Sequence, residues 1–429
     1  MNYDVLIVLF TFLGLMALGM PVFMSMGISA TLGYLMHEGL DRLFENLAFG
    51  AFSSLNSYML MAVPLYILAG TLLEATGLSM RLFTFAAVWV RGFRGGLGVA
   101  TVIACSIFAA ISGSSVATAA TIGLVALPVL AKNGYQSGPA GALVAAGGTL
   151  GILIPPSIGL LLFGVLTDQS VGALFVAGVA PGIVLALLMA IYTSISTPPN
   201  ATISKASWPE RLRATREAGP ILALPIIIFV GIYTGFATPT EVAAVAVLYI
   251  IIVGLSYRCL GFTEFMVAGK RAITSSVMIS MLVAFGSLLT GYFTLTGVPQ
   301  AITQLIVGSG LGFFGSVTLI ILFYLILGMF LEALSMMLLT VPILYPVALA
   351  LGIHPLAFGI FVVLAVEVAQ VTPPVGINLF TVSSIGKIPF DKLSKSIVPY
   401  VLIMIAVMYL VVYQPKLSVW LPSTMGYGT

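Results

Sequence analysis

The segment that decides the fold is Gly-Gly-Thr-Leu-Gly-Ile-Leu-Ile-Pro-Pro-Ser at residues 147–157, where two adjacent prolines interrupt a long apolar run. A proline pair removes two backbone donors and breaks a helix, which frees carbonyl groups of the preceding turn. A second Pro-Pro segment, Glu-Val-Ala-Gln-Val-Thr-Pro-Pro-Val-Gly-Ile-Asn, lies at residues 367–378. Broken membrane helices use such freed carbonyls to coordinate sodium. A plain proline kink is the alternative, although the duplication of the pair favours a site.

The composition around these segments is that of a polytopic membrane protein. The 429 residues are 60% hydrophobic and only 7% charged, whereas about 25% of residues are charged in soluble proteins. The net charge of +3 provides no polybasic face for nucleic acid, and two His with two Cys cannot supply a conventional zinc or iron-sulfur ligand set. The N-terminal apolar run lacks the basic segment and cleavage site of a signal peptide, so we expect a retained helix.

Three apolar runs are too long for one crossing, because a single membrane helix needs about 20 residues. These runs are 95–131, 219–257 and 312–351. Each contains a visible interruption: Gly113-Ser114-Ser115 in the first, Thr238-Pro239-Thr240 in the second and Glu332–Ser335 in the third. We therefore expect each run to enter and return, or to break inside the bilayer.

Basic residues predict the orientation of the chain. They cluster at Arg81/Arg91/Arg94, at Lys205/Arg211/Arg213/Arg216, at Arg258/Lys270/Arg271 and at Lys387/Lys392/Lys395. The positive-inside bias places all four clusters in the cytoplasm. The net acidic segment 37–45 is then expected outside, and following the crossings puts the C-terminus in the periplasm.

An internal repeat relates the two halves of the chain. Prolines at positions 21, 128, 155, 156 and 181 each meet a proline of the second half at one constant offset, at positions 239, 346, 373, 374 and 399. We call this shift, from Pro21 to Pro239, the repeat offset. The charges place corresponding segments on opposite sides of the membrane, so we predict an inverted repeat. Inverted repeats with interrupted helices at matching positions are typical of secondary transporters, whose sites lie near the midplane.

The predicted fold is an all-α polytopic membrane protein with two inverted-topology repeats, each with a re-entrant helical hairpin and a Pro-Pro-broken helix. We expect an elevator-type division into a scaffold and a transport domain. The first repeat would be 1–197 (scaffold 1–94, hairpin and transport elements 95–197) and the second 219–414 (scaffold 219–311, hairpin and transport elements 312–414), joined by a cytoplasmic linker 198–218 and followed by a periplasmic tail 415–429. The segments 77–94 and 297–308 would form interfacial arm helices, or else solvated loops.

The hairpin tips are the expected place for chemistry, because non-helical backbone at membrane depth is tolerated only where it is buried in protein or lines a wet cavity. Ser112, Ser114 and Ser115 interrupt the first run, and Glu332 lies at the second tip. Two ordinary passes joined by a polar turn, or small residues that serve only helix packing, are the alternatives.

Intramembrane carboxylates are functional candidates, and here they are Glu74, Glu241, Glu332 and Glu367, of which Glu332 and Glu367 adjoin the duplicated breaks. No Lys or Arg lies in either split run or either Pro-Pro segment. An anionic substrate would therefore be held by helix N-termini, co-bound cations and polar side chains. The candidates for substrate binding are Ser115, Thr118, Thr149, Ser157, Ser335 and Asn378.

The two Pro-Pro segments and the apolar run that ends in Ser-Gly-Ser-Ser at 112–115, in this order and at this length, resemble the large membrane subunit of tripartite ATP-independent periplasmic (TRAP) transporters. The resemblance covers essentially the whole chain. It implies a sodium-driven elevator importer of the bacterial inner membrane that belongs to the ion-transporter superfamily. It also implies a small four-helix membrane subunit and a periplasmic binding protein as partners, with acidic solutes such as C4-dicarboxylates or sialic acid as substrates.

The resemblance also implies two sodium sites and no organic cofactor. The first would lie between the first hairpin tip and the Pro-Pro element, at Ser112, Ser114, Gly151, Ile154 and Pro156, mostly through carbonyl oxygens. The second would be its counterpart at the repeat offset, at Phe330, Glu332, Ala369, Thr372 and Pro374. The second tip departs from the first, because Glu332 stands where the first has Ser114.

Three other functions compete with this interpretation. A self-sufficient dicarboxylate or citrate symporter or exchanger of the same superfamily would transport without partners. An intramembrane serine hydrolase using Ser114 or Ser115 would need a base, and the only histidines, His37 and His354, are expected outside the spans. A channel is disfavoured because duplicated hairpins of opposite polarity suit alternating access. We therefore expect a transporter and not an enzyme.

Overall fold

The computed structural model describes residues 3–197 and 205–427, and the part of the chain so described is helical without strands. The first half contains α1 (Tyr3–Ala17), α2 (Val22–Glu38), α3 (Leu40–Leu55), η1 (Tyr58–Met61), α4 (Ala62–Ala75), α5 (Ser79–Val90), α6 (Gly96–Ser112), α7 (Ser115–Lys132), α8 (Ser137–Thr149), η2 (Leu150–Ile152), α9 (Ile158–Thr167) and α10 (Val171–Ser196). The second half contains α11 (Trp208–Tyr233), α12 (Pro239–Ser256), α13 (Phe262–Leu295), α14 (Val298–Gly308), α15 (Gly312–Leu327), α16 (Ala333–Ala350), α17 (Pro355–Val371), α18 (Ile377–Gly386), α19 (Phe390–Tyr413) and α20 (Lys416–Thr424). The all-α membrane fold is confirmed, with eight described helices long and apolar enough to span a bilayer.

The predicted linker and tail fall partly on helices. Residues 198–204 of the predicted linker 198–218 lie outside the described residues, and its second part already belongs to α11, which begins at Trp208. Residues 428–429 of the predicted tail also lie outside the described part, while Lys416–Thr424 is helical. The predicted arm segments 77–94 and 297–308 contain the helices α5 and α14.

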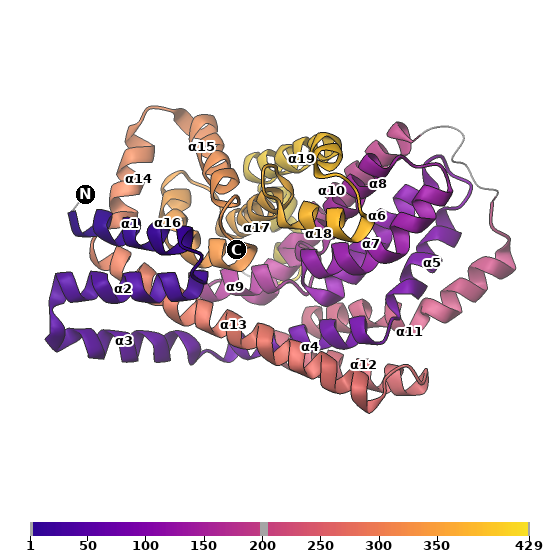
Figure 1. Ribbon diagram of the computed structural model, residues 1–429, viewed down its shortest axis with the longest axis horizontal. Helices are drawn as coiled ribbons and strands as arrows, with labels where there is room; N and C mark the ends of the chain where they lie inside the picture. Colours follow the sequence, from indigo (N-terminus) through magenta and orange to yellow (C-terminus); the bar gives the residue numbers. More distant parts are fainter. Residues whose placement is uncertain (1–2, 198–204, 428–429) are drawn as a thin grey trace.

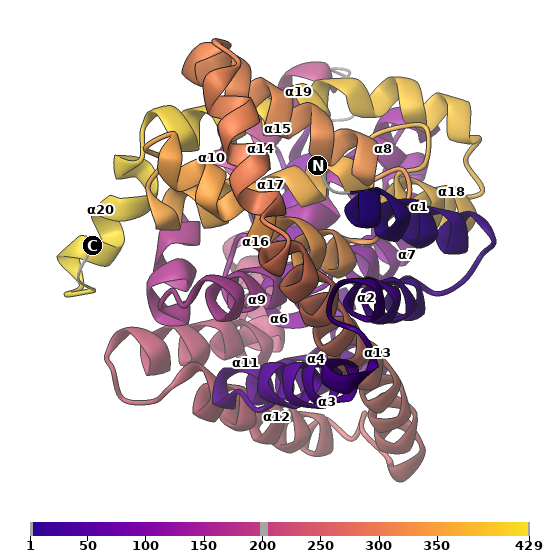
Figure 2. The same ribbon diagram turned by 90° about the vertical axis from the view of Figure 1, so that its left-hand side faces the viewer.

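The helices gather into two groups that are linked at a few places. In the first group, α13 packs against α2, α3 and α4, and α4 packs against α12. In the second, α8 packs against α6, α7 and α19, while α17 packs against α16 and α19. Figure 2 shows α3 and α12 below and α19 and α8 above. The groups meet where α4 contacts α6 and where α13 contacts α16, and the helices α5 and α14 also pack against α6 and α16.

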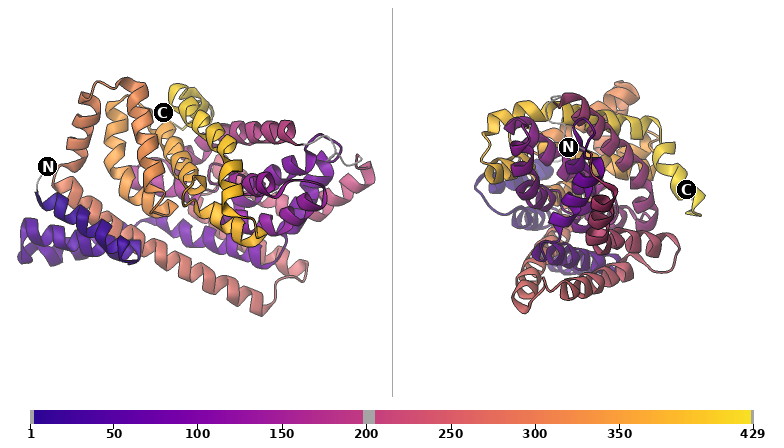
Figure 3. Two further views of the ribbon diagram at one scale, coloured as in Figure 1. Left: turned by 45° about the horizontal axis from the view of Figure 1, so that its top comes forward. Right: turned by 90° about the vertical axis from the view of Figure 1, so that its right-hand side faces the viewer.

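The molecule is elongated, with its two ends built from different helices. Figure 1 shows α1, α2 and α3 at one end and α5 with the start of α11 at the other. The long helix α13 runs along one side, from α12 toward the N-terminal helices. The left panel of Figure 3 shows the indigo N-terminal helices projecting at their end of the molecule.

Helix boundaries recur at the repeat offset that the prolines define. α7 begins at Ser115 and α16 at Ala333, α8 begins at Ser137 and α17 at Pro355, and both pairs of starting positions are separated by that same offset. The order of helices from α5 to α10 is repeated from α14 to α19, with η2 as the one element that has no helical counterpart among the described residues. The chain thus contains two copies of one series of helices.

One element differs between the copies. The first half has α3, a break at Asn56 and Ser57, η1 and then α4, where the second half has the single 34-residue helix α13. The sequence predicts an apolar span at 273–295, but α13 already begins at Phe262. Lys270 and Arg271 therefore lie inside a helix, where their long aliphatic stems can follow an apolar surface while the charges stay in water.

The predicted interruptions are present as helix ends. Gly113, with a left-handed φ of 63°, ends α6, and Ser114 begins the next helix as its N-cap. The Pro-Pro segments follow η2 and α17, and both Pro-Pro peptide bonds are cis. Thr238 caps α12 together with Glu241, whose carboxylate accepts the Thr238 backbone N–H at 2.8 Å. Side chains thus cap the helices that follow the breaks before α7, α9, α12 and α16, whereas α18 begins after Gly376 without a side-chain cap.

Candidate functional site

The two hairpin tips meet at one cavity of about 800 Å³. Its wall includes Ser112–Ala117 from the first tip and Glu332–Leu334 from the second. α17 contributes Glu367 and Gln370, while α4 and α13 form the opposite side. Segments from opposite halves of the chain thus line one space between the two groups of helices.

The first tip is held by hydroxyl groups. The Ser112 and Thr118 hydroxyls lie 3.1 Å apart, and Thr118 Oγ1 also donates to the Ser114 carbonyl at 2.8 Å. Ser114 Oγ accepts the Ala117 backbone N–H at 3.3 Å, which makes Ser114 the N-cap of α7. These bonds fix the turn around Gly113, so the tip presents a defined set of oxygen atoms.

The second tip is built in the same way around a carboxylate. Glu332 is the N-cap of α16, and its Oε1 accepts the Ser335 backbone N–H at 3.2 Å and the Ser335 hydroxyl at 3.0 Å. At the repeat offset, Glu332 and Ser335 are the counterparts of Ser114 and Ala117. The difference between the two tips that the sequence shows, Glu332 in place of Ser114, is therefore a replacement of one N-cap residue by another. The replacement adds negative charge at the second tip.

Each tip helix closely approaches the broken helix of its own repeat. A Cβ at Gly151, in η2, would overlap Ala109 of α6. In the second half the glycine belongs to the tip side instead of the broken helix. A Cβ at Gly328, just after α15, would overlap Ala369 of α17. Ala369 is the counterpart of Gly151 at the repeat offset. Both copies thus use one glycine to bring the tip helix onto the predicted sodium segment.

Freed carbonyls gather at the second Pro-Pro segment. Gly376 has a left-handed φ of 56°, and a Cβ there would lie 3.3 Å from the Thr372 oxygen and 3.4 Å from the Gln370 oxygen. The side chain of Gln370 donates to the Leu331 carbonyl at 3.4 Å, which links this segment to the second tip. Glycine is needed here for both the backbone conformation and the space.

The predicted residues divide into those that line the cavity and those that do not. Ser112, Ser114, Ser115 and Glu332 line it. The remaining predicted residues are not among its lining: Thr118, Thr149, Gly151, Ile154, Pro156, Ser157, Phe330, Ser335, Ala369, Thr372, Pro374 and Asn378. Several of these have local structural bonds. Thr149 donates to the Ala146 carbonyl at 2.7 Å, and Ser157 caps α9. Phe330 is 68% exposed.

The four carboxylates predicted to lie inside the membrane have different surroundings. Glu74 pairs with Arg271 at 3.3 Å, and Glu241 belongs to the cap of α12. Glu367 is buried, and neither of its oxygens has a hydrogen-bond partner in the described structure, although Ser115 is a neighbour. An unpaired buried carboxylate is costly unless it binds a proton or a cation. Among these four carboxylates, Glu367 is thus the one that lines the cavity without a hydrogen-bond or ion-pair partner in the described structure.

Comparison with known proteins identifies the family. The profile of the tripartite ATP-independent periplasmic transporter DctM component matches residues 9–417. The chain belongs to this family. Among curated relatives, it is 36% identical to the C4-dicarboxylate TRAP transporter large permease protein DctM of Vibrio cholerae, over 96% of each chain. It is 33% identical to the sialic acid TRAP transporter large permease protein SiaM of the same species, over 98% of this chain and 99% of the relative. It is 30% identical to the ectoine TRAP transporter large permease protein TeaC of Halomonas elongata, over 96% and 97%.

Solved structures show the same fold at low identity. The YdaH transporter of Alcanivorax borkumensis aligns with a TM-score of 0.64 at 16% identity, covering 100% of both chains. MtrF of Neisseria gonorrhoeae aligns with a TM-score of 0.61 at 14% identity, covering 90% of this chain and 85% of the other. This TRAP large permease is thus a multi-pass membrane protein and a transporter subunit, not an enzyme.

Several residues of this TRAP subunit's cavity were missed by sequence reasoning. Lys270, Arg271, Thr274 and Ser275 form one polar wall from α13, and Gly70 of α4 lies against Ser112. The spacing of the α13 residues, at i, i+1, i+4 and i+5, puts them on one face of a helix. That spacing could have identified the polar face, but not the cavity that it meets.

Proposed function

We propose that this chain is the large permease of a sodium-coupled TRAP importer in the bacterial inner membrane, with its C-terminus in the periplasm. It would move a small organic anion by an elevator mechanism. A periplasmic binding protein would deliver the substrate, and a small four-helix membrane subunit would complete the membrane complex. The observation that carries this proposal is the single cavity at which both hairpin tips meet the α4 and α13 wall.

Sodium coupling is supported by the oxygens at the breaks. The proposed sites remain Ser112, Ser114, Gly151, Ile154 and Pro156 in the first repeat and Phe330, Glu332, Ala369, Thr372 and Pro374 in the second. The close approaches at Gly151 and Gly328 bring each tip helix beside the segment that would supply carbonyl ligands. The clustering of two carbonyls at Gly376 adds to this argument. Sodium, a hard cation, suits such oxygen ligands.

A carboxylate substrate fits the charges of the cavity. C4-dicarboxylates, sialic acid and ectoine, named for the relatives, all carry a carboxylate group. The tips supply hydroxyls and backbone groups, while Lys270 and Arg271 add positive charge on the α13 wall. Sodium ions at the breaks would neutralise the remaining negative charge. The substrate would then bind between the tips and the α13 wall.

An elevator motion is supported by the division into two groups of helices. The proposed scaffold contains α2, α3, α4, α12 and α13, which pack on one another, and the proposed transport domain contains the tips and the Pro-Pro segments. The cavity lies between them. Movement of the transport domain along α4 and α13 would carry both tips, with their sodium ions and substrate, across the membrane.

Reconstitution tests the proposal. Proteoliposomes would contain this chain alone, this chain with the small subunit, or both subunits with substrate-loaded binding protein, each in sodium and in choline. We expect uptake only with the complete set and only in sodium. Uptake of free substrate by this chain alone would instead favour the alternative, a self-sufficient dicarboxylate or citrate symporter or exchanger. An unchanged rate in choline would overturn the sodium coupling.

A further inference from the structure

We propose that the junction of α5 and α11 is a binding site for the headgroups of anionic phospholipids. The site consists of the guanidinium groups of Arg211 and Arg216 and the exposed apolar side chains of Trp208 and Leu212. It lies at the end of the molecule away from α1–α3 (Figure 1). It is separate from the tip cavity, so it does not depend on the proposed transport mechanism.

Positive charge is concentrated at this junction. Segments 81–94 and 205–217 contain seven of the sixteen Lys and Arg residues of the chain but only two acidic residues, Glu210 and Glu217. Their net charge is therefore +5, whereas the whole chain carries +3. Clusters of four to eight basic residues next to membrane helices attract anionic lipids. The junction thus has the charge that such a surface requires.

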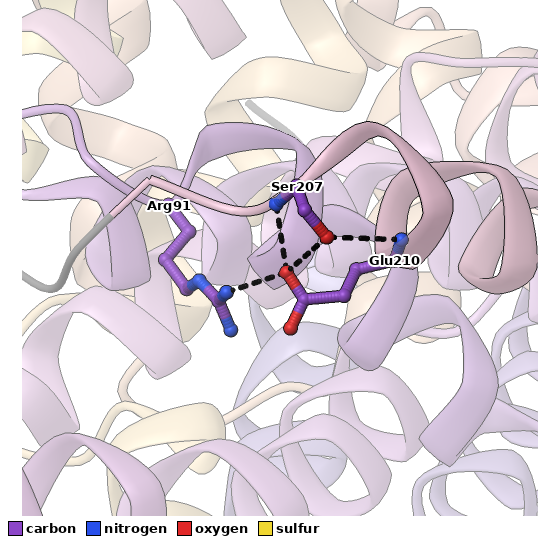
Figure 4. Close-up of polar contacts among 3 residues, drawn as sticks. All are labelled: Arg91, Ser207 and Glu210. Atoms are coloured by element: carbon purple, nitrogen blue, oxygen red, sulfur yellow. Dashed lines mark hydrogen bonds and ion pairs between the residues drawn. The ribbon is translucent and has the colours of Figure 1, made fainter.

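The two acidic residues are already paired. Figure 4 shows Glu210 between Arg91 and Ser207. Its carboxylate accepts from the Arg91 guanidinium at 2.9 Å and from the Ser207 backbone N–H at 2.7 Å. Glu217 pairs with Arg213 at 2.9 Å. Arg211 and Arg216 form no ion pair with the described residues, so their charges are available to a phosphate.

Aromatic packing holds Arg211 in place. Its guanidinium lies 5.6 Å from the ring centre of Trp89 and 5.4 Å from that of Trp208, within the range of cation–π attraction. The two Trp rings meet edge to face at 6.4 Å, and Trp89 Nε1 donates to Thr215 Oγ1 at 3.0 Å. α5 and α11 are thus joined into one surface, and the arginine does not have to be ordered again when a headgroup binds.

An exposed apolar stripe identifies the partner as a lipid. Trp208 is 73% exposed and Leu212 is 72% exposed, and the two are four residues apart on one face of α11. Phe93, also near the junction in sequence, is 64% exposed. Apolar side chains flanked by basic ones are typical of helices that lie in the membrane interface, and Trp is enriched there. A nucleic acid or free phosphate would use the charges but would not need the stripe.

Lipid affinity tests the charges. The full-length chain would be placed in nanodiscs of phosphatidylcholine with increasing fractions of phosphatidylglycerol, and bound phosphatidylglycerol would be measured by native mass spectrometry after extraction. Arg211→Gln/Arg216→Gln should weaken this binding about tenfold or more, since each basic residue near an anionic surface contributes about a factor of five. The control Lys392→Gln/Lys395→Gln removes two charges from α19, where Asp391 lies beside Lys392, and should weaken binding clearly less than the arginine variant does.

Fluorescence tests the apolar stripe without relying on the arginine variant. In a Trp89→Phe/Trp420→Phe background, which keeps an aromatic ring beside Arg211, Trp208 is the only tryptophan, and native mass spectrometry first checks that this background binds phosphatidylglycerol as the wild type does. We expect brominated phosphatidylglycerol to quench its emission more strongly than brominated phosphatidylcholine at equal bromine content. Equal quenching by the two lipids would overturn the proposal. Equal loss of phosphatidylglycerol in the arginine and lysine variants would overturn it too, since it would show attraction by net charge alone.

Discussion

At the scale of single residues, the same N-cap position is occupied by a serine hydroxyl in one tip and by a glutamate carboxylate in the other. Ser114 and Glu332 are counterparts at the repeat offset and cap the helices that follow the two tips, each through a backbone N–H three residues on. An oxygen acceptor is what the exposed helix end requires. The carboxylate at the second tip adds charge that the serine does not. The two tips are therefore alike in backbone and different in electrostatics.

The carboxylates near the breaks should matter most. We predict that Glu332→Gln and Glu367→Gln reduce sodium-driven uptake, because these groups face the cavity where cations are proposed to bind. Glu74→Gln is the matched control, since Glu74 also lines the cavity but pairs with Arg271. Uptake would be measured in proteoliposomes at equal protein content. Equal activity of the three variants would show that Glu332 and Glu367 have no special role.

Loss of a sodium ligand should raise the sodium concentration that is needed for half-maximal uptake. Ser112→Ala and Pro156→Ala perturb the proposed first sodium site, the former by removing a hydroxyl and the latter by restoring a backbone donor. The loss of one good ligand costs about 1–3 kcal/mol, which corresponds to roughly a tenfold or greater rise in the sodium concentration for half-maximal uptake. A sodium titration at saturating substrate measures this shift. A lower maximal rate at unchanged sodium dependence would contradict the assignment.

At the scale of elements, the contact between α4 and the first tip depends on one glycine. A Cβ at Gly70 would lie 2.9 Å from Ser112 Cα and 3.0 Å from its carbonyl oxygen. Both contacted atoms belong to the backbone of Ser112, so no change of side-chain rotamer can relieve the overlap. This is the point at which the proposed scaffold meets the first tip on the α4 side of the cavity.

Gly70→Ala should therefore disfavour the arrangement seen here. Overpacking costs about 1–3 kcal/mol, whereas Gly to Ala in an open helix position stabilises by up to about 1 kcal/mol. Gly269→Ala in α13, where a Cβ would meet no atom within 4 Å, is the control. We expect about tenfold slower uptake for Gly70→Ala and no loss for Gly269→Ala. A Gly70→Ala variant as active as wild type would show that this contact does not constrain transport.

The tips should be accessible to water. Single cysteines, Ser114→Cys or Ala333→Cys, would be introduced at these two cavity-lining positions after removing Cys105 and Cys259. We predict that a membrane-impermeant thiol reagent labels both sites, with a rate that sodium changes. A cysteine at buried Ala243 of α12 serves as the unlabelled control. If neither tip is labelled with or without sodium, the tips are ordinary helix contacts.

At the scale of the whole molecule, the two copies of the helix series supply one tip each to a shared cavity. The copies differ mainly where α13 is continuous and its counterpart is broken into α3, η1 and α4. The continuous helix carries the basic residues of the cavity, Lys270 and Arg271, whereas the transport elements carry the carboxylates Glu332 and Glu367; both sides contribute hydroxyl groups. Charge is thus distributed asymmetrically across a space formed by related segments.

This distribution predicts that transport moves net positive charge inward. The proposed transport elements contain no Lys or Arg at the tips or Pro-Pro segments, so the positive charge that moves with the substrate would come from sodium, and we expect the sodium charge to exceed that of the substrate. An inside-negative potential, set by a potassium gradient with valinomycin, should speed uptake by the reconstituted complex. A rate that is independent of the potential would indicate electroneutral exchange and contradict the prediction.

The sequence by itself determined the class of fold, the places where helices break and the offset between the copies. Proline and glycine determine the conformation of their own backbone, and a low content of charged residues is a property of a whole segment. These features can therefore be recognised without knowing which helices pack together. Helices end and begin at the interruption at 112–115 and at both Pro-Pro segments. The starting positions of corresponding helices are separated by the repeat offset.

Only the tertiary structure decided which side chains share the cavity. Lys270 and Arg271, predicted from the sequence to belong to a cytoplasmic cluster, form part of its wall, while Thr149 and Asn378 are not among its lining residues. Glu241 proved to be a helix cap and Glu367 an unpaired buried carboxylate. The reason is physical: the face that a helix presents, and the neighbour it meets, depend on close packing between segments from opposite halves of the chain, and no local preference encodes that meeting.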